Sequence, residues 1–292
     1  MYSQMQYQIT HTTRYNHTEP VPVCYNYVHL APRSLPFQNC ADHDVLISPA
    51  PAERVKQSDY FNNQVEYFSI HEPHLGLTVT AKSTVSVSPR PPLDTSAVPS
   101  WESIAAKIRI DYLQDCQFIF DSPHIRRSAQ FADYGRQSFV PGRSIIDAAL
   151  DLTHRIFKDF KFDNKATTVS TPVEEVFVKR MGVCQDFAHL QITCLRSLGL
   201  AARYVSGYLR TIPPPGKPRL VGADASHAWI SLFCGPLGWV DFDPTNDALP
   251  GTDYVILAWG RDYSDVCPIQ GVFTGGGKHT MTVSVDVLPL GS

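Results

Sequence analysis

The spacing of the apolar residues changes twice along this chain, and each change marks a different kind of secondary structure. Up to residue 88, apolar and polar residues alternate in short runs that are separated by Pro, Asn and Asp. This pattern predicts the strands of an antiparallel sandwich. Between residues 100 and 200 the period becomes 3.6, as in helices, and between 202 and 290 it returns to two. The sequence therefore predicts an α+β fold.

A proline-rich segment separates the first part of the chain from the rest. Residues 89–92 read Pro-Arg-Pro-Pro, and proline cannot donate the hydrogen bond that a strand requires. We therefore expect a β-rich, sandwich-like domain over residues 1–92 and a second domain over residues 93–292. In the second domain, the helices of residues 100–200 are expected to pack on an antiparallel sheet formed by residues 202–290.

The ends of three helices can be predicted from their capping residues. An apolar stripe between residues 145 and 160 indicates a helix that begins near Ser144. Thr171, followed by proline and then by glutamate three positions on, is a start signal for a second helix, which is expected to end at Gly182. A third helix follows at once, and Gly199 suits the left-handed residue that ends it.

Charge and hydropathy exclude several kinds of partner. The 292 residues carry 25 basic and 28 acidic side chains, so the chain lacks the basic footprint of a nucleic-acid-binding protein. No stretch approaches the ~18 consecutive apolar residues of a membrane-spanning helix. The first residues lack the apolar core of a signal peptide, and we expect a cytoplasmic protein whose thiols stay reduced.

The chain has seven cysteines, and their spacing argues against a metal site. No two of them form a C-x-x-C pair, which is the usual element of structural zinc sites and of redox motifs. We expect neither a metal nor a cofactor. Most of the cysteines are expected to be small buried apolar residues.

Cys184 differs from the other cysteines because it stands in the first turn of the third predicted helix. The free backbone N–H groups and the positive end of the helix dipole favour a thiolate over a thiol at this position. The same N–H groups suit an oxyanion formed by attack of the sulfur on a carbonyl. Helix position alone is equally compatible with a Cys184 that merely starts the apolar stripe.

A predicted β-hairpin supplies a histidine and an aspartate. Two alternating runs flank a turn at residues 234–238. When the chain is folded about that turn, we expect Trp229 opposite Asp241 and His227 opposite Asp243, with their side chains on one face. A slip of two residues would instead make Asp241 the partner of His227.

Together these residues predict a nucleophile, a base and a group that orients the base: Cys184, His227 and Asp243. Each has a structural alternative. His227 is equally suited to a half-exposed strand position beside an aspartate, and Asp243 to capping the turn before Pro244. His189 lies five residues after Cys184 on the same helix, and we expect it to serve in packing or capping.

Three ordered motifs carry a resemblance to a known family. The segments GVCQDFAHL, DASHAWISLF and GWVDFDPTND resemble the motifs of the transglutaminase-like superfamily: a cysteine at a helix N-terminus, an H-x-W strand and a D-P-T turn. The opening segment HTTRYNHTEPVPV and the late segment GGGKHTMTVSVDV resemble the β-rich parts that accompany this core in bacterial proteins. The resemblance implies a papain-like α+β core and acyl transfer through a thioester, with Cys184, His227 and Asp243 as catalytic residues.

Three residues beside the triad are candidates for the substrate cleft. They are Gln185, Trp229, which is the tryptophan of the H-x-W motif, and Asp241. The family's oxyanion-stabilising aromatic residue has no confident match upstream of Cys184, so none is assigned.

Three functions remain open at this point. The first is a thiol hydrolase that cleaves a peptide or amide bond in a peptide or protein substrate. The second is a protein-glutamine gamma-glutamyltransferase, in which an amine instead of water resolves the thioester. The third is a non-catalytic binding module. We expect hydrolysis, since nothing in the sequence indicates the calcium sites or extra β-domains of animal cross-linking enzymes. Substrate identity and oligomeric state are not readable from the sequence.

Overall fold

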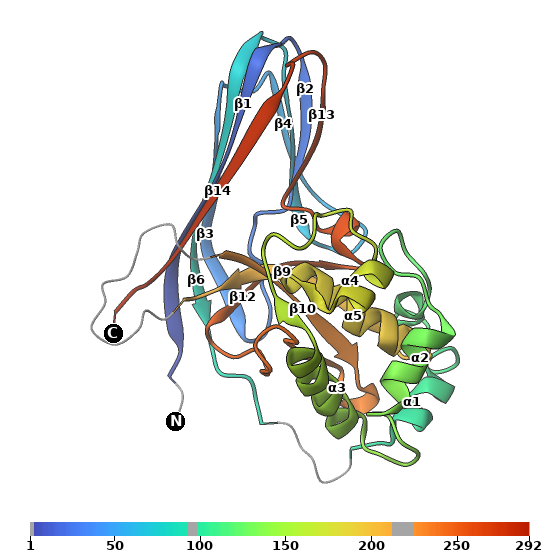
Figure 1. The fold of residues 1–292 in the computed structure, drawn as a ribbon. Coiled ribbons are helices and arrows are strands. Elements are labelled where there is room, and N and C mark those ends of the chain that lie inside the picture. Colours follow the sequence, from blue (N-terminus) through green and yellow to red (C-terminus); the bar gives the residue numbers. More distant parts are fainter. Residues whose placement is uncertain (1–2, 93–97, 212–224, 292) are drawn as a thin grey trace, which may run out of the picture.

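A long β-sandwich stands against a second sheet that is covered by helices (Figure 1). This computed structural model describes residues 3–92, 98–211 and 225–291. The mixed architecture, with antiparallel sheets and helices gathered on one of them, confirms the predicted α+β class. Within the described residues, no helix combines the length and the apolar character needed to cross a membrane.

The elements follow one another along the chain in the order strands, helices, strands. Their bounds are β1 Met5–Val21, β2 Cys24–Val28, β3 Gln38–Ser48, β4 Glu53–Ser58, β5 Gln64–Ile70, β6 His74–Val87, α1 Trp101–Lys107, η2 Cys116–Ile119, α2 Ala129–Arg136, α3 Ile145–Asp159, β7 Lys161–Phe162, α4 Val173–Lys179, β8 Met181–Gly182, α5 Cys184–Ser197, β9 Ala202–Leu209, β10 Ala225–Phe233, η3 Gly235–Leu237, β11 Trp239–Phe242, β12 Tyr254–Gly260, η4 Tyr263–Asp265, β13 Ile269–Phe273 and β14 His279–Pro289.

The sandwich consists of two four-stranded sheets with the orders β14-β1-β6-β3 and β13-β2-β5-β4. Alternate residues of β1, from Tyr7 and Ile9 to His11 and Thr13, are buried. Both sheets receive their last strand from the C-terminal end of the chain, since β14 pairs with β1 and β13 with β2. The expectation that residues up to 290 belong to the second sheet was therefore wrong for β13 and β14. Alternation predicts a strand but does not name its partner.

The second sheet has the order β11-β10-β9-β12, and α5 packs across β9 and β10. Figure 1 shows α5 running between this sheet and the other helices. All of its residues from Asp186 to Arg196 are buried, among them Phe187, Leu190 and Leu195. A helix that is buried on every side has no freedom to tilt, and this fixes the position of its first residue, Cys184.

The predicted helix ends were correct for α3 and α5 and wrong for α4. Ser144 accepts a hydrogen bond from the backbone N–H of Asp147 at 3.3 Å, and Gly199 follows α5 with a φ of +81°. The helix expected to end at Gly182 begins at Val173 and ends at Lys179. It ends early because residues 181 and 182 form β8, which pairs in parallel with β7.

Side chains of the sandwich complete the edge of the second sheet. The hydroxyl of Tyr7 donates to the carbonyl of Thr252 at 3.0 Å and to the carboxylate of Asp253 at 3.1 Å. The amide of Gln38 donates to the carbonyl of Ile256 at 2.8 Å and accepts from its N–H at the same distance. Strand β12 is therefore held from both sides, by β9 and by the sandwich.

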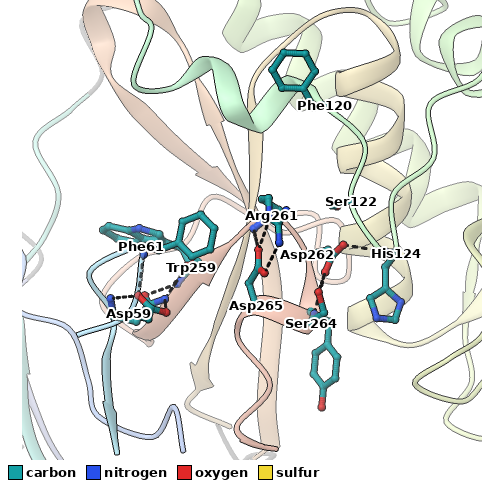
Figure 2. A network of polar contacts seen from close by, with 12 residues as sticks. Asp59, Phe61, Phe120, Ser122, His124, Trp259, Arg261, Asp262, Ser264 and Asp265 are labelled. Atoms are coloured by element: carbon teal, nitrogen blue, oxygen red, sulfur yellow. Dashed lines mark hydrogen bonds and ion pairs between the residues drawn. The ribbon is translucent and has the colours of Figure 1, made fainter. Parts of the chain in front are cut away.

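A second group of contacts holds the chain where β12 ends, as Figure 2 shows for Asp59, Trp259 and Asp262. Asn63 of the sandwich donates to the carbonyl of Trp259 at 2.9 Å and to Asp59 at 2.7 Å. The carboxylate of Asp262 accepts from the backbone N–H of His124 at 2.8 Å. The end of β12 is thus tied on one side to the sandwich and on the other to the segment before α2.

Acidification is expected to destabilise the protein through His11, which is 2% exposed between β1 and β9. Its ring nitrogens contact the Tyr208 hydroxyl at 3.0 Å and the Thr13 hydroxyl at 3.1 Å. Burial lowers the pKa of His11 to about 4. The unfolded chain takes up this proton near pH ~6.5, so the free energy of unfolding falls as the pH drops from that value towards the folded pKa. We expect a loss of about 2 kcal/mol between about pH 7 and about pH 5.

Urea unfolding at the two pH values measures this loss. In a His11→Gln variant, the pH-dependent loss is expected to shrink by the same amount, because no titratable group remains there. The control is His279→Gln, which replaces an exposed histidine of β14. An unchanged pH dependence in His11→Gln would assign the acid sensitivity to other groups.

Candidate active site

The start of α5 is shaped so that Cys184 is its first residue. The carboxylate of Asp186 accepts hydrogen bonds from the backbone N–H of Val183 at 2.8 Å and from the Thr167 hydroxyl at 2.6 Å. A Cβ atom at position 182 would lie 2.7 Å from that carboxylate, which is too close, so only glycine fits there. Cys184 itself is partly exposed.

Asp186 was not among the residues predicted from the sequence. Its signal was present, since an acidic residue in the first turn commonly caps the preceding N–H groups. Burial raises the pKa of Asp186 against the opposing effect of its two hydrogen bonds.

His227 interacts with a carboxylate and with the Cys184 sulfur. Its Nε2 is 2.7 Å from Oδ2 of Asp243, and the Cys184 thiol is close enough to the ring to help raise its pKa. Because Nε2 faces the carboxylate, Nδ1 is the nitrogen left for the thiol. Burial opposes the charged ring, but the hydrogen bonds to Asp243 and Cys184 outweigh it and raise the pKa of His227 to about 10.

Asp243 is completely buried and is held by donors on both of its oxygens. The Tyr254 hydroxyl and the Asn246 amide donate to Oδ2 at 2.8 Å and 2.7 Å, and the backbone N–H of Thr245 donates to Oδ1 at 2.8 Å. Burial acts to raise the pKa of Asp243, but the hydrogen bonds from His227, Asn246 and Tyr254 lower it overall. The carboxylate therefore stays ionised beside the imidazole.

Asn246 and Tyr254 were missed by the sequence analysis. Asn246 directly follows the D-P-T motif, and asparagine in a turn commonly forms hydrogen bonds with neighbouring residues. Tyr254 carries no such signal, because it comes from the next strand, β12, and reaches Asp243 only through the folded sheet.

The hairpin register differs from the predicted one by two residues. Asp241 opposes Ser231 and not Trp229, because the strands close directly around the five-residue turn and Phe233 opposes Trp239. The backbone N–H of Cys234 donates to the carbonyl of Gly238 at 2.8 Å and fixes this closure. His227 and Asp243 still meet, diagonally, because β11 ends at Phe242 and the chain turns there.

The three cleft candidates occupy different environments. Gln185 is partly exposed, and its amide donates to the carbonyl of Val169 at 3.0 Å. Trp229 is completely buried, and its indole N–H donates to Asp241 at 3.2 Å. Asp241 is 5% exposed and also pairs with Arg90 at 2.7 Å. Trp229 and Asp241 thus contact each other beside the triad, and a direct role in substrate binding stays a prediction for all three residues.

Gly207 makes room for the buried indole of Trp229. It lies opposite His227 on β9, and a Cβ atom there would approach the Trp229 ring to 2.5 Å. The ring in turn packs edge-on against Tyr254, with centroids 5.4 Å apart. The tryptophan of the H-x-W motif therefore supports two residues of the site, His227 on its own strand and Tyr254 on β12.

The remaining candidates serve in packing. His189 is buried, accepts from the backbone N–H of Tyr263 at 3.2 Å and stacks on His124. Cys194 and Cys234 are buried, and burial raises the pKa of both thiols. Across the described ranges, no group of three or more His, Cys, Asp or Glu side chains is arranged to hold a metal ion.

Two family models match the chain in the order seen in the structure. The bacterial transglutaminase-like N-terminal region matches residues 7–86, and the transglutaminase-like superfamily core matches residues 135–244, which include Cys184, His227 and Asp243. The chain belongs to the transglutaminase-like superfamily.

Its relatives extend over different shares of the chain. An uncharacterised protein of Mycobacterium tuberculosis H37Rv is 42% identical over 97% of this chain and 93% of its own length. A protein-glutamine gamma-glutamyltransferase of Pseudomonas aeruginosa is 29% identical over 42% of this chain and 19% of its own length. The crystal structure of a candidate cysteine protease from Cytophaga hutchinsonii aligns with a TM-score of 0.80 at 20% identity, covering 100% of this chain and 92% of that one. This last likeness establishes the shared fold.

Proposed function

We propose that this transglutaminase-like protein is a cysteine hydrolase that cleaves a peptide or other amide bond of a peptide or protein substrate. One observation carries the proposal: His227 contacts the buried carboxylate of Asp243, and the Cys184 thiol acts on the same ring. A cationic imidazole in this position stabilises a thiolate, and the carboxylate keeps the ring protonated and oriented. The cytoplasmic location expected from the sequence stays a prediction.

The geometry supports a two-step reaction. The Cys184 thiolate attacks the amide carbonyl, and we expect N–H groups of the first turn of α5 to hold the oxyanion. The C–N bond breaks as His227 gives its proton to the leaving amine, which leaves a thioester on Cys184. Water then attacks the thioester, gives a proton to His227 and releases the carboxylic acid, and the thiolate is restored.

A transferase is the second candidate, and one relative favours it. The Pseudomonas aeruginosa protein named for gamma-glutamyl transfer is similar over the part of this chain that it matches. In that reaction an amine takes the place of water in the second step, so both enzymes share the same thioester. The two candidates differ only in the acceptor.

Alkylation of the cysteines tests the catalytic role. Cys184 is expected to react with iodoacetamide roughly tenfold or more faster than Cys40, Cys116 and Cys267, the other partly exposed thiols. Mass spectrometry of the alkylated peptides gives the individual rates. A Cys184→Ala variant is expected to lose turnover of a peptide library, while the matched Cys116→Ala variant keeps it.

The products distinguish the remaining functions. Peptide fragments without incorporated amine support the hydrolase, and incorporation of an added primary amine supports the transferase. If Cys184 reacts no faster than the other thiols and no product forms, the chain is a binding module and the proposal fails.

A further inference from the structure

A cavity of about 710 Å³ lies beside Tyr254, whose hydroxyl holds Asp243 of the triad. Three segments build it: the proline-rich residues 89–92, the end of β11, and the segment that leads into β12. The residues that line it are Pro89, Arg90, Pro91, Pro92, Val240, Asp241, Leu249, Pro250, Gly251, Thr252, Asp253 and Tyr254. A cavity of this size is large enough to enclose a side chain of a bound peptide.

The walls of the cavity are mainly apolar, and its charged groups are already paired. Arg90 lies 2.7 Å from Asp241, and Asp253 lies 2.7 Å from Arg210. Prolines and aliphatic side chains form most of the remaining surface. A ligand group with its own charge would find no free counter-charge among these residues, whereas an apolar group would be transferred from water to an apolar surface.

The cavity is also pre-formed. The guanidinium of Arg90 lies 4.3 Å from the centre of the Phe37 ring, which fixes the proline-rich wall against the sandwich. On the opposite wall, the Tyr7 hydroxyl holds the carbonyl of Thr252 and the carboxylate of Asp253. Binding therefore does not require these walls to be ordered first.

Tyr254 connects the cavity to the catalytic geometry. It lines the cavity, donates its hydroxyl to Asp243 at 2.8 Å, and has its ring centre 6.1 Å from that of His227. His227 contacts Asp243 through Nε2, and the Cys184 thiol acts on the same ring. The cavity therefore lies next to the side of the histidine that faces Asp243.

We propose that this cavity binds an uncharged apolar side chain of the substrate, on the amine side of the amide bond that Cys184 attacks. This inference rests on the proposed function, in which His227 gives its proton to the leaving amine. The leaving part of the substrate must then lie over His227, and its next side chain is directed towards Tyr254. An amine that resolves the thioester would enter the same cavity, since it approaches along the path by which the first amine leaves.

Filling the cavity tests the proposal. A Cβ atom at Gly251 would meet no atom within 4 Å, and the backbone there is not in the left-handed region, so Gly251→Trp can place an indole in the cavity without strain. The matched control is Val178→Trp on α4, where the original side chain is 79% exposed. Peptides that differ only in the residue after the cleaved bond (leucine, glycine or aspartate) are compared by kcat/KM.

We expect wild type and Val178→Trp to prefer leucine over glycine by about tenfold or more, and to discriminate further against aspartate. Gly251→Trp is expected to lose the preference while its Cys184 reacts with iodoacetamide at the wild-type rate. Equal kcat/KM values in wild type, or an intact preference in Gly251→Trp, would overturn the assignment.

A binding measurement separates this inference from the proposed function. The probe is L-leucine N-methylamide, observed by saturation-transfer NMR on the catalytically inactive Cys184→Ala chain. Its signal is expected to disappear in Cys184→Ala/Gly251→Trp and to persist in Cys184→Ala/Val178→Trp. Failure of the alkylation test with intact probe binding would refute the enzyme and leave the cavity. Absence of binding, or equal binding of L-aspartate N-methylamide, would refute the cavity assignment alone.

Discussion

An Asp243→Asn variant is expected to lose about 10³- to 10⁴-fold in kcat/KM, as is found when the orienting carboxylate of such a triad is made neutral. Asp243 holds Nε2 of His227 at 2.7 Å and is one of the groups that raise the pKa of His227 to about 10. The protonated ring is the form that supports the thiolate and supplies the proton for the leaving amine. Loss of the Asp243 charge therefore reduces the fraction of His227 that is protonated. It also weakens the contact that orients the ring.

The pH profile carries the second part of this prediction. Because the raised pKa keeps His227 protonated, the charged ring persists below pH about 10 and is lost above it. In Asp243→Asn the pKa of His227 falls, so the alkaline limb of the profile is expected to move to lower pH. Rates of peptide cleavage and of Cys184 alkylation, measured over the same pH range, report the shift.

Asp247→Asn is the matched control for this variant. Asp247 lies in the same turn, but its carboxylate pairs with His154 on α3 at 2.6 Å and does not contact the triad. Its activity is expected to stay near that of wild type, and thermal unfolding shows whether each variant is folded. If Asp243→Asn keeps its activity and the position of its alkaline limb, Asp243 serves only to cap the turn before Pro244.

Arg196→Met is expected to lower the free energy of unfolding by about 3 to 5 kcal/mol. Arg196 is 1% exposed at the end of α5. Its guanidinium donates to the carbonyl of Ala202 at 3.0 Å and 2.8 Å, to that of Phe120 at 2.9 Å and to that of Arg261 at 2.6 Å. Phe120 and Arg261 are among the residues drawn in Figure 2. Methionine fills similar space but leaves these buried carbonyls without donors.

Urea unfolding measures the loss, and the surface offers a control. Arg136 on α2 pairs with Asp133, and both side chains are exposed. Arg136→Met is therefore expected to change the unfolding free energy by less than about 1 kcal/mol. Equal losses in the two variants would mean that the buried contacts of Arg196 contribute no more than a surface ion pair.

The parts of the fold that depend on local pattern could be predicted from the sequence. Ser144 and Gly199 mark helix ends because capping is decided within a few residues. Cys184 was placed at a helix start for the same reason. The family and the fold class were also correct, because three motifs in a fixed order carried them.

The parts that depend on distant contacts could not be predicted. The alternating pattern of β14 gave no sign that it pairs with β1, and the hairpin register was wrong because pairing along β10 continues two residues further towards the turn than expected. Tyr254 reaches Asp243 from another strand, and no spacing in the sequence encodes that approach. Each error concerns a partner that the chain brings close only when it is folded.

The pairing of β1 with β14 has a consequence for the order in which the protein is completed during synthesis. The ribosome synthesises β1 long before β14. Helix α5 and the four strands of the second sheet are therefore made before the edge strands β13 and β14 of the two sandwich sheets. A chain that stops at residue 268 would carry Cys184, His227 and Asp243, yet would leave β1 and β2 with open edges that invite aggregation. The nascent protein therefore gains its braced, closed form only after β13 and β14 have been made.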